Sequence, residues 1–157
     1  MPFDPLQYKT TTRQQWDDAA EAWHRWGPTL EAWLGEATEA MLDAAGVTEG
    51  SRVLDVAAGA GGQTIAAARR VGGDGTVIAS DLSPTILSFA AKSAAEVGLT
   101  NIETLVADGE ALDLPAGSID AVISRLGMIY FPDQHAALVG MREALRDGGR
   151  LAVITYS

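Results

Sequence analysis

The chain is organised around the stretch Val53-Leu54-Asp55-Val56-Ala57-Ala58-Gly59-Ala60-Gly61-Gly62. A short apolar run that contains an acid is followed by a loop almost without side chains and then by an alanine-rich segment, which predicts a strand, a tight turn and a helix. Gly59 and Gly61 can adopt backbone angles closed to other residues and let a ligand approach the main chain. The free N–H groups that begin a helix point back at such a ligand. Glycine-rich turns of this kind serve several ligands and also plain structure, so the stretch alone identifies none.

Strands and helices alternate from this stretch to the end of the chain. We predict strands at residues 52–56, 76–80, 102–106, 119–124 and 150–155. The helices between them are expected at 62–71, from a Ser83 cap to 97, and from 132 or 133 to a stop at Gly148-Gly149, with a turn or short helix near 110–112. Branched apolar strands that alternate with helices predict the α/β class, with a doubly wound, mostly parallel sheet of five strands.

Two helices are predicted ahead of the sheet. The first dozen residues have the composition of a flexible lead, Thr12 is placed to cap a helix over 13–26, and Pro28 opens a second helix that stops at Gly46. All four tryptophans of the chain fall in these helices. They either pack the helices onto the sheet or cover a cofactor or an apolar substrate. We expect one compact unit, with a helical cap at 1–47 and a ligand-binding domain at 48–157.

Composition restricts the classes of function. The 157 residues suit one domain, and 47% hydrophobic with 20% charged residues is typical of a globular protein. No apolar run approaches the roughly 20 residues that cross a bilayer, and no signal-peptide layout is present, so no membrane span and a cytoplasmic location are expected. The chain has no cysteine, and its two histidines lack metal-ligand spacing, so we expect no metal. A net charge of −10 without a basic patch argues against nucleic acid and for a small-molecule substrate.

Acids lie at the ends of three successive strands of the predicted sheet. Ligands of doubly wound sheets bind at the carboxyl ends of the strands, where the chain carries Asp55, Asp81 and Asp108. Asp81 follows Asp55 at about the distance expected of an acid that binds ribose hydroxyls, and Asp108 is placed to meet an adenine amino group. Asp81 could also belong to the helix start, and Asp108 could cap a turn. The three acids together favour a ligand site.

Five motifs in this order resemble those of class I S-adenosylmethionine-dependent methyltransferases, and most of all the branch of the ubiquinone and menaquinone biosynthesis methyltransferases. The motifs are the opening stretch at 53–62, Val77-Ile78-Ala79-Ser80-Asp81-Leu82-Ser83-Pro84, and residues 107–112, 118–124 and 145–151. The match covers about residues 50–157, and the amino-terminal helices resemble the variable cap of that branch. The resemblance implies a Rossmann-like fold, S-adenosyl-L-methionine as cofactor of the domain at 48–157, and methyl transfer to a small, apolar or aromatic acceptor.

The resemblance also implies roles for residues of the glycine loop. Asp55 is expected to organise the loop, and Gly59 and Gly61 to approach the methionine part of the cofactor. Ala57 stands where the family usually has glycine, and its methyl group is expected to tighten the loop.

Roles are implied for the later strand ends as well. Asp81 is expected to bind the ribose hydroxyls while Leu82 lies against the adenine. Asp108 is expected to meet the adenine amino group with Gly109 beside it, and Ser124 to lie near the methionine end.

The implied reaction is an in-line attack of the acceptor on a sulfonium methyl group, for which the protein supplies orientation and a dry site. A base is needed only if the acceptor must lose a proton. His24 and His135 are candidates because an unperturbed histidine titrates near neutrality, and Arg125 is a third. The alternatives are a surface position for each histidine, an acid partner for Arg125, and a solvated surface position for Glu110. The sequence therefore assigns no catalytic residue.

The family's sheet has seven strands, whereas this sequence stops at Ile154-Thr155-Tyr156-Ser157, the end of the fifth. We therefore expect a fragment or a shortened protein in which strand five is an exposed edge. A homodimer or domain-swapped assembly is expected through that edge or through the amino-terminal helices. Two other functions stay open, a module that binds S-adenosylmethionine without turnover and an NAD-type oxidoreductase, which the glycine spacing disfavours.

Overall fold

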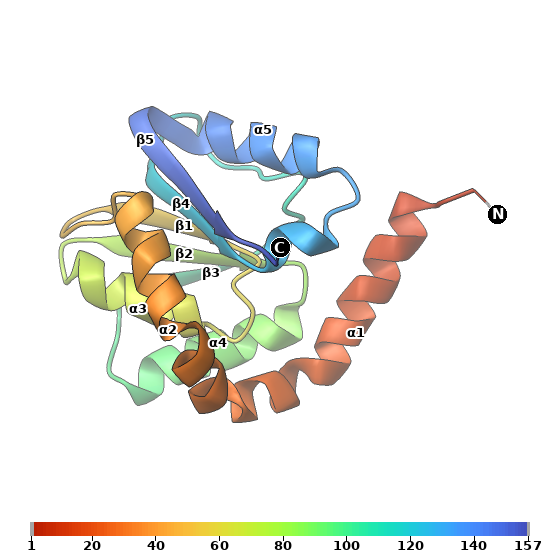
Figure 1. Cartoon of the computed structure of the whole chain (residues 1–157), viewed down its shortest axis with the longest axis horizontal. Coiled ribbons are helices and arrows are strands. Elements are labelled where there is room, and N and C mark those ends of the chain that lie inside the picture. The colour runs from red at the N-terminus through yellow and green to blue at the C-terminus, as the bar shows by residue number, and fades with distance from the viewer. Residues whose placement is uncertain (1, 157) are drawn as a thin grey trace.

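The computed structural model describes residues 2–156 and has a central sheet with helices on both faces (Figure 1). All strand pairs are parallel and their order is β3-β2-β1-β4-β5. The strands are β1 Arg52–Val56, β2 Thr76–Asp81, β3 Ile102–Val106, β4 Ile119–Arg125 and β5 Leu145–Ile154. The helices are α1 Pro5–Arg25, α2 Gly27–Ala44, α3 Gly62–Val71, α4 Pro84–Glu96 and α5 Gln134–Ala144, with a 3₁₀ helix at Gly127–Tyr130. This arrangement confirms the predicted fold class.

Side chains that alternate along the central strands build two cores. Val53 of β1 faces Leu42 of α2 and Val71 of α3 on one side of the sheet, and α4 covers the same side farther along. Leu54, the next residue of β1, faces Met141 of α5 on the other side. β1 is buried from Val53 to Val56, and three of these four residues are apolar, as is usual for parallel strands covered on both faces.

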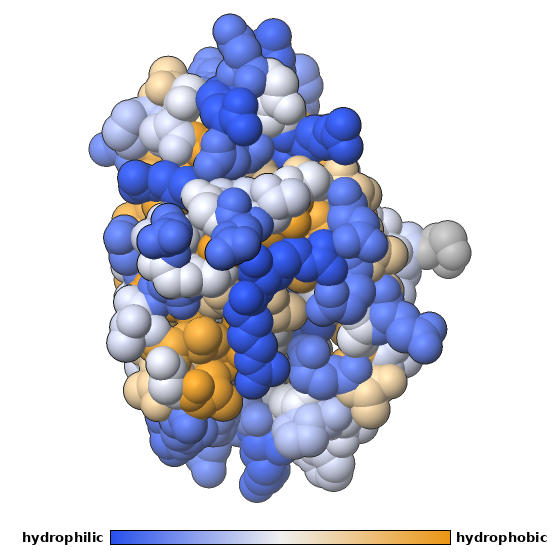
Figure 2. All heavy atoms as spheres, turned by 90° about the vertical axis from the view of Figure 1, so that its left-hand side faces the viewer, coloured by the Kyte–Doolittle hydropathy of each residue, from blue (hydrophilic) through white to orange (hydrophobic). Residues whose placement is uncertain are grey.

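The strand order reverses beside β1, which has β2 on one side and β4 on the other. The carboxyl ends of these strands therefore open a crevice at a topological switch point, where ligands bind in sheets of this kind. In Figure 1, α1 stands across this end of the sheet. The opposite end, which faces the viewer in Figure 2, is covered mainly by hydrophilic residues with smaller apolar areas between them.

The expected flexible lead is wrong, because α1 already begins at Pro5. The Asp4 carboxylate accepts hydrogen bonds from the backbone N–H groups of Leu6 and Gln7, at 2.9 and 3.2 Å, and Pro5 occupies the first turn. An acidic cap followed by proline is a helix-start signal. Thr12 does not cap a helix; it lies inside α1 and is buried.

The end of α5 and the start of β5 also differ from the prediction. The helix ends at Ala144, and the strand begins at Leu145 rather than at 150. The Gly148-Gly149 pair, expected to stop the helix, lies inside the strand. The pairing of β4 with β5 shifts register between Ile119 and Ala121, and Gly148 has a φ of 78°, so the glycines absorb an irregularity of the strand.

The other predicted boundaries agree with the structure within two residues, and β1, α3 and β3 match at both ends. The 3₁₀ helix Gly127–Tyr130 was not predicted, and residues 110–112 form only a turn. No helix within residues 2–156 is long and apolar enough to cross a membrane. The proposed division at residue 47 stays a prediction, and Ser157 lies outside the described residues.

Candidate functional site

A pocket of about 1030 Å³, part of it open to solvent, lies at the carboxyl ends of the strands. Its floor is the loop after β1, and its walls are the residues that follow β2, β3 and β4, together with the inner sides of α1 and α2. The lining from the strand ends is Val56, Ala57, Ala58, Gly59, Ser80, Asp81, Leu82, Ala107, Asp108, Gly109 and Arg125. The structure thus brings together the glycine loop and the acids after β2 and β3, as the sequence predicted.

The glycine loop turns sharply below the pocket. Gly59 and Gly61 both have positive φ, 59° and 90°, which only glycine adopts easily. A Cβ atom at Gly61 would lie 2.9 Å from the Cβ of Ala90 in α4, so α4 requires a glycine there. Ala57 also has a positive φ, 60°, which is a strained conformation for a residue with a Cβ atom. The added methyl group is therefore accommodated with backbone strain.

Asp55 lies beneath this loop and is completely buried. Its carboxylate accepts hydrogen bonds from Thr64 Oγ1 at 2.6 Å and from Gln63 Nε2 at 3.2 Å, both on the first turn of α3. Burial raises the pKa of Asp55 to about 7. Asp55 does not line the pocket, and its hydrogen bonds join the end of β1 to the first turn of α3.

Asp81 lies at the pocket surface and ties two loops together. One carboxylate oxygen accepts the backbone N–H of Gly59 at 3.0 Å, and the other accepts the backbone N–H of Ser83 at 3.0 Å. Burial raises the pKa of Asp81, although these backbone hydrogen bonds lower it. Leu82 lines the pocket beside it. An acceptor of this kind, fixed by the main chain, can bind a pair of ligand hydroxyls.

Asp108 carries a partner that the sequence did not predict. Lys9 of α1 places its ammonium group 2.7 Å from Asp108 Oδ2 and 2.6 Å from Glu110 Oε2. Burial alone lowers the pKa of Lys9, but the hydrogen bonds to the two acids outweigh it and the pKa is raised. The expectation of a solvated Glu110 is wrong, because its side chain is 9% exposed and also accepts the backbone N–H of Asp133.

Gly109 lines the pocket next to Asp108 and has no room for a side chain. A Cβ atom there would lie 2.5 Å from the ring of Phe131. Ser124, by contrast, does not line the pocket. It is fully buried, and its hydroxyl donates to the carbonyl of Val56 at 2.8 Å, which ties β4 to β1.

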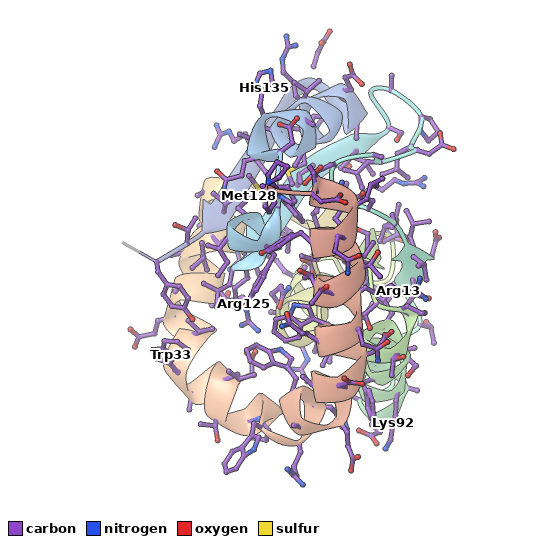
Figure 3. The ribbon with its side chains drawn as sticks, turned by 90° about the vertical axis from the view of Figure 1, so that its right-hand side faces the viewer. Arg13, Trp33, Lys92, Arg125, Met128 and His135 are labelled. Carbon is purple, nitrogen blue, oxygen red and sulfur yellow. The ribbon has the colours of Figure 1, made fainter. Side chains whose placement is uncertain are left out.

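The three candidate catalytic residues lie in different parts of the structure. His24 stacks on Phe89 with a centroid distance of 4.9 Å, and its Nδ1 lies 3.2 Å from Ser93 Oγ, away from the pocket. His135 is exposed on α5 and points outward in Figure 3. Arg125 lines the pocket and forms an ion pair with Glu31 of α2. Of the three, only Arg125 belongs to the site.

Aromatic side chains that the sequence did not assign form one wall of the pocket. Trp16 meets Trp23 edge to face at 5.2 Å and Tyr130 at 5.4 Å. All three line the pocket, whereas Trp26 and Trp33 are 58% and 60% exposed. The spacing of seven between Trp16 and Trp23 places both on one face of α1, which was the available signal. The tryptophans therefore divide, two covering the pocket and two facing solvent.

Comparisons with known proteins agree with this geometry. A profile of the ubiE/COQ5 methyltransferase family matches residues 34–157. Aklanonic acid methyltransferase DauC of Streptomyces sp. (strain C5) is 34% identical over 145 residues, which cover 92% of this chain and 64% of that protein. Ubiquinone/menaquinone biosynthesis C-methyltransferase UbiE of Cronobacter sakazakii (strain ATCC BAA-894) is 33% identical over 117 residues, 74% of this chain and 47% of that protein.

Solved structures share the fold. A SAM-dependent methyltransferase from Aquifex aeolicus superposes with a TM-score of 0.64 and 26% identity, over 69% of this chain and 58% of that chain. The chain thus spans less than two thirds of the length of each of these relatives.

Proposed function

Because the chain belongs to the ubiE/COQ5 methyltransferase family, we propose that its pocket binds S-adenosyl-L-methionine and that the whole protein transfers the cofactor's methyl group to a small, apolar or aromatic acceptor. The observation that carries the proposal is the hydrogen bond from the Gly59 N–H to the Asp81 carboxylate. It joins the glycine loop after β1 to the acid that ends β2 at the surface of one pocket.

The residues present fit an adenosyl cofactor. We assign the ribose hydroxyls to Asp81, the adenine to Leu82 and Gly109, and the adenine amino group to Asp108. Gly59 leaves the main chain bare for the remainder of the cofactor. Gly61 does not line the pocket, and its bare face lies against Ala90 of α4. Asp55 and Ser124 hold the loop from behind, without contact with the cofactor. These roles are supported by the positions of the side chains around the pocket.

An apolar acceptor fits the remaining part of the pocket. Trp16, Trp23 and Tyr130 present flat, apolar surface there. Aromatic rings bind planar ligands by stacking and edge-to-face contacts. The two curated relatives are named for aklanonic acid and for ubiquinone/menaquinone biosynthesis. We take from them only the class of small-molecule acceptors.

The chemistry needs little from the protein beyond position. Bound cofactor supplies an electrophilic methyl group on a sulfonium. The aromatic wall excludes water, and the loop and Asp81 fix the cofactor so that an acceptor can attack in line. Neither His24 nor His135 reaches the pocket, so we assign no general base among the described residues.

A homodimer through β5 is part of the proposal. Among residues 2–156, β5 pairs only with β4, and Val153 on it is 41% exposed. An exposed edge of this kind is a template for another strand. A monomer in light scattering down to low micromolar concentration would contradict the dimer. We also propose a cytoplasmic location, supported by the ordinary globular composition and open to test by cell fractionation.

Calorimetric titration tests the cofactor assignment. We expect S-adenosylmethionine and S-adenosylhomocysteine to bind and NAD not to bind. Binding of NAD alone would restore the oxidoreductase alternative. Methyl transfer is then assayed on a panel of quinols, phenols, amines and carboxylic acids. Cofactor binding without transfer to any of them would favour the alternative of a binding module without turnover.

A further inference from the structure

Ser83 links α1 to the acid that ends β2. It lies between β2 and α4 and is completely buried. Its backbone N–H donates to Asp81 Oδ1 at 3.0 Å, and its hydroxyl oxygen accepts the Ile86 N–H at 3.0 Å. The same hydroxyl donates its hydrogen to Asp17 Oδ1 of α1 at 2.5 Å. A hydroxyl has a single hydrogen to donate, so the contacts with Ile86 and Asp17 together hold the Ser83 side chain in one orientation.

Asp17 is a fixed, ionised acceptor at the start of α4. Its side chain is 21% exposed, and α1 packs against α4 on the side where Figure 3 labels Arg13 and Lys92. Thr85 also donates hydrogen bonds to this carboxylate, from its backbone and from its side chain. The hydrogen bond from Ser83 does most to lower the pKa of Asp17, against the effect of burial. An acceptor from α1 therefore completes the N-terminal cap of α4.

The orientation of Asp81 depends on this contact. Each oxygen of its carboxylate accepts one backbone N–H, from Gly59 on one side and from Ser83 on the other. A carboxylate oxygen has about two lone-pair sites, so one site on each oxygen stays available for a pair of ligand hydroxyls. The direction of these free sites is set by the two N–H donors. Because Asp17 holds Ser83, it also holds one of those donors in place.

We propose that Asp17 is a positioning residue of the nucleoside site, which acts through Ser83 to hold the Asp81 carboxylate in the orientation that accepts both ribose hydroxyls of the ligand. The inference rests on the proposed function, because the ribose is assigned there to Asp81. Asp17 does not line the pocket, so its effect on a ligand passes through its neighbours. The helix α1 thereby takes part in recognition of the nucleoside as well as forming the aromatic wall.

Two nucleosides that differ only in the ribose hydroxyls isolate this effect. Adenosine carries both hydroxyls, and 2′,3′-dideoxyadenosine carries neither. Each is titrated by calorimetry into wild type, Asp17→Ala, Asp17→Asn and the matched control Asp18→Ala. Asp18 is the next residue of α1 and is exposed, and its only side-chain hydrogen bond among residues 2–156 is with Gln14. Circular dichroism verifies that each variant is folded. Ser83→Ala cuts the same link from the α4 side and replaces Asp17→Ala if that variant is unfolded.

Wild type and Asp18→Ala are expected to prefer adenosine to the same degree. Asp17→Ala should bind adenosine about fivefold more weakly and bind 2′,3′-dideoxyadenosine within about twofold of wild type. Asp17→Asn keeps an acceptor oxygen for the Ser83 hydroxyl and should recover most of the loss. In the Asp81→Ala background, Asp17→Ala should have no further effect on adenosine, because its influence on the ligand passes through Asp81.

The inference is overturned if Asp17→Ala leaves both nucleosides unchanged, or if it weakens both equally, as expected of a residue that only anchors α1 to α4. An undiminished effect of Asp17→Ala in the Asp81→Ala background would also overturn it. In each of these cases wild type still binds S-adenosylhomocysteine, so the proposed function stands and only the role of Asp17 is lost. Failure of the proposed function looks different, because wild type would then bind neither S-adenosylhomocysteine nor adenosine, and the inference would fall with it.

Discussion

Lys9 Nζ lies 2.7 Å from Asp108 Oδ2, although the two residues are 99 positions apart in the chain. The ion pair fastens the first half of α1 over the end of β3. In our assignment the same carboxylate receives the adenine amino group. Lys9 therefore competes with the ligand for Asp108 while it holds α1 in place.

Removal of the Lys9 charge is expected to tighten adenosine binding. Lys9→Met frees the Asp108 carboxylate, and a partly exposed ion pair is worth about 0.2 to 1 kcal/mol, so 5′-methylthioadenosine should bind up to about fivefold more tightly. Calorimetry measures the change. Lys92→Met is the matched control, because Lys92 is exposed on α4 and Glu96 is its only ion-pair partner among residues 2–156. Weaker binding by Lys9→Met would show that Lys9 supports the site instead of competing for it.

Ala57→Gly is expected to stabilise the fold. Ala57 has a φ of 60°, which strains any residue with a Cβ atom. After allowance for the greater freedom of glycine in the unfolded chain, the free energy of unfolding should rise by roughly 0.5 to 1 kcal/mol. Urea denaturation measures it. Ala60 lies in the same loop without a positive φ, so Ala60→Gly should lower the free energy of unfolding. Equal effects of the two variants would contradict the claim that Ala57 is strained.

Asp55 is expected to make stability depend on pH. Its pKa is raised by burial to about 7, so between about pH 4 and 7 the folded state holds a proton that the unfolded state has lost. Stability from this group therefore falls as pH rises through that window. The side chain of Asp55→Asn cannot titrate. The free energy of unfolding of this variant, relative to that of wild type, should therefore increase by roughly a few kcal/mol between pH 4.5 and 7.5.

Urea unfolding at several pH values measures this difference. Asp74→Asn is the control, because Asp74 is exposed in the turn before β2. A difference between Asp55→Asn and wild type that stays constant with pH would show that Asp55 titrates normally.

Ligand binding is expected to change the fluorescence of the pocket tryptophans only. Trp23 lies against the glycine loop, with its Nε1 3.5 Å from the position of a Cβ at Gly59, so a bound ligand alters its surroundings. Trp23→Phe should remove much of the signal change on addition of S-adenosylhomocysteine. Trp26→Phe should leave that change intact, because Trp26 faces solvent. The reverse pattern would place the ligand elsewhere.

The sequence predicted the sheet well because its signals are local. Strands such as β1 and β3 are short runs rich in branched apolar residues. The helix α4 is capped by Ser83 and starts at Pro84, and the Ser83 hydroxyl accepts the Ile86 N–H at 3.0 Å. Asp4-Pro5 carries the same kind of signal, but it was missed in a segment read as flexible. β5 was misplaced because its paired glycines resemble a helix stop, and only the pairing with β4 makes them part of a strand.

The positions of the three acids were predicted from the strand ends. Asp81 and Asp108 line the pocket, and Asp55 lies buried beneath it. The site was not predicted where distant segments meet. The packing of α1 brings Lys9 to the pocket, and the packing of α2 brings Glu31 to Arg125. Nothing in the local sequence of either residue marks it. Their partners, Asp108 and Arg125, lie more than 90 positions away.

The central claim is that Asp81 anchors an adenosyl cofactor, and calorimetric titration of S-adenosylhomocysteine into wild type, Asp81→Ala, Asp81→Asn and the exposed-site control Asp74→Ala tests it most directly. Circular dichroism verifies that each variant is folded. We predict that wild type and Asp74→Ala bind alike, that Asp81→Ala loses at least tenfold in affinity, and that Asp81→Asn, which keeps one acceptor oxygen, lies between them. Equal affinity for Asp81→Ala and wild type, or no binding by wild type, would contradict the account.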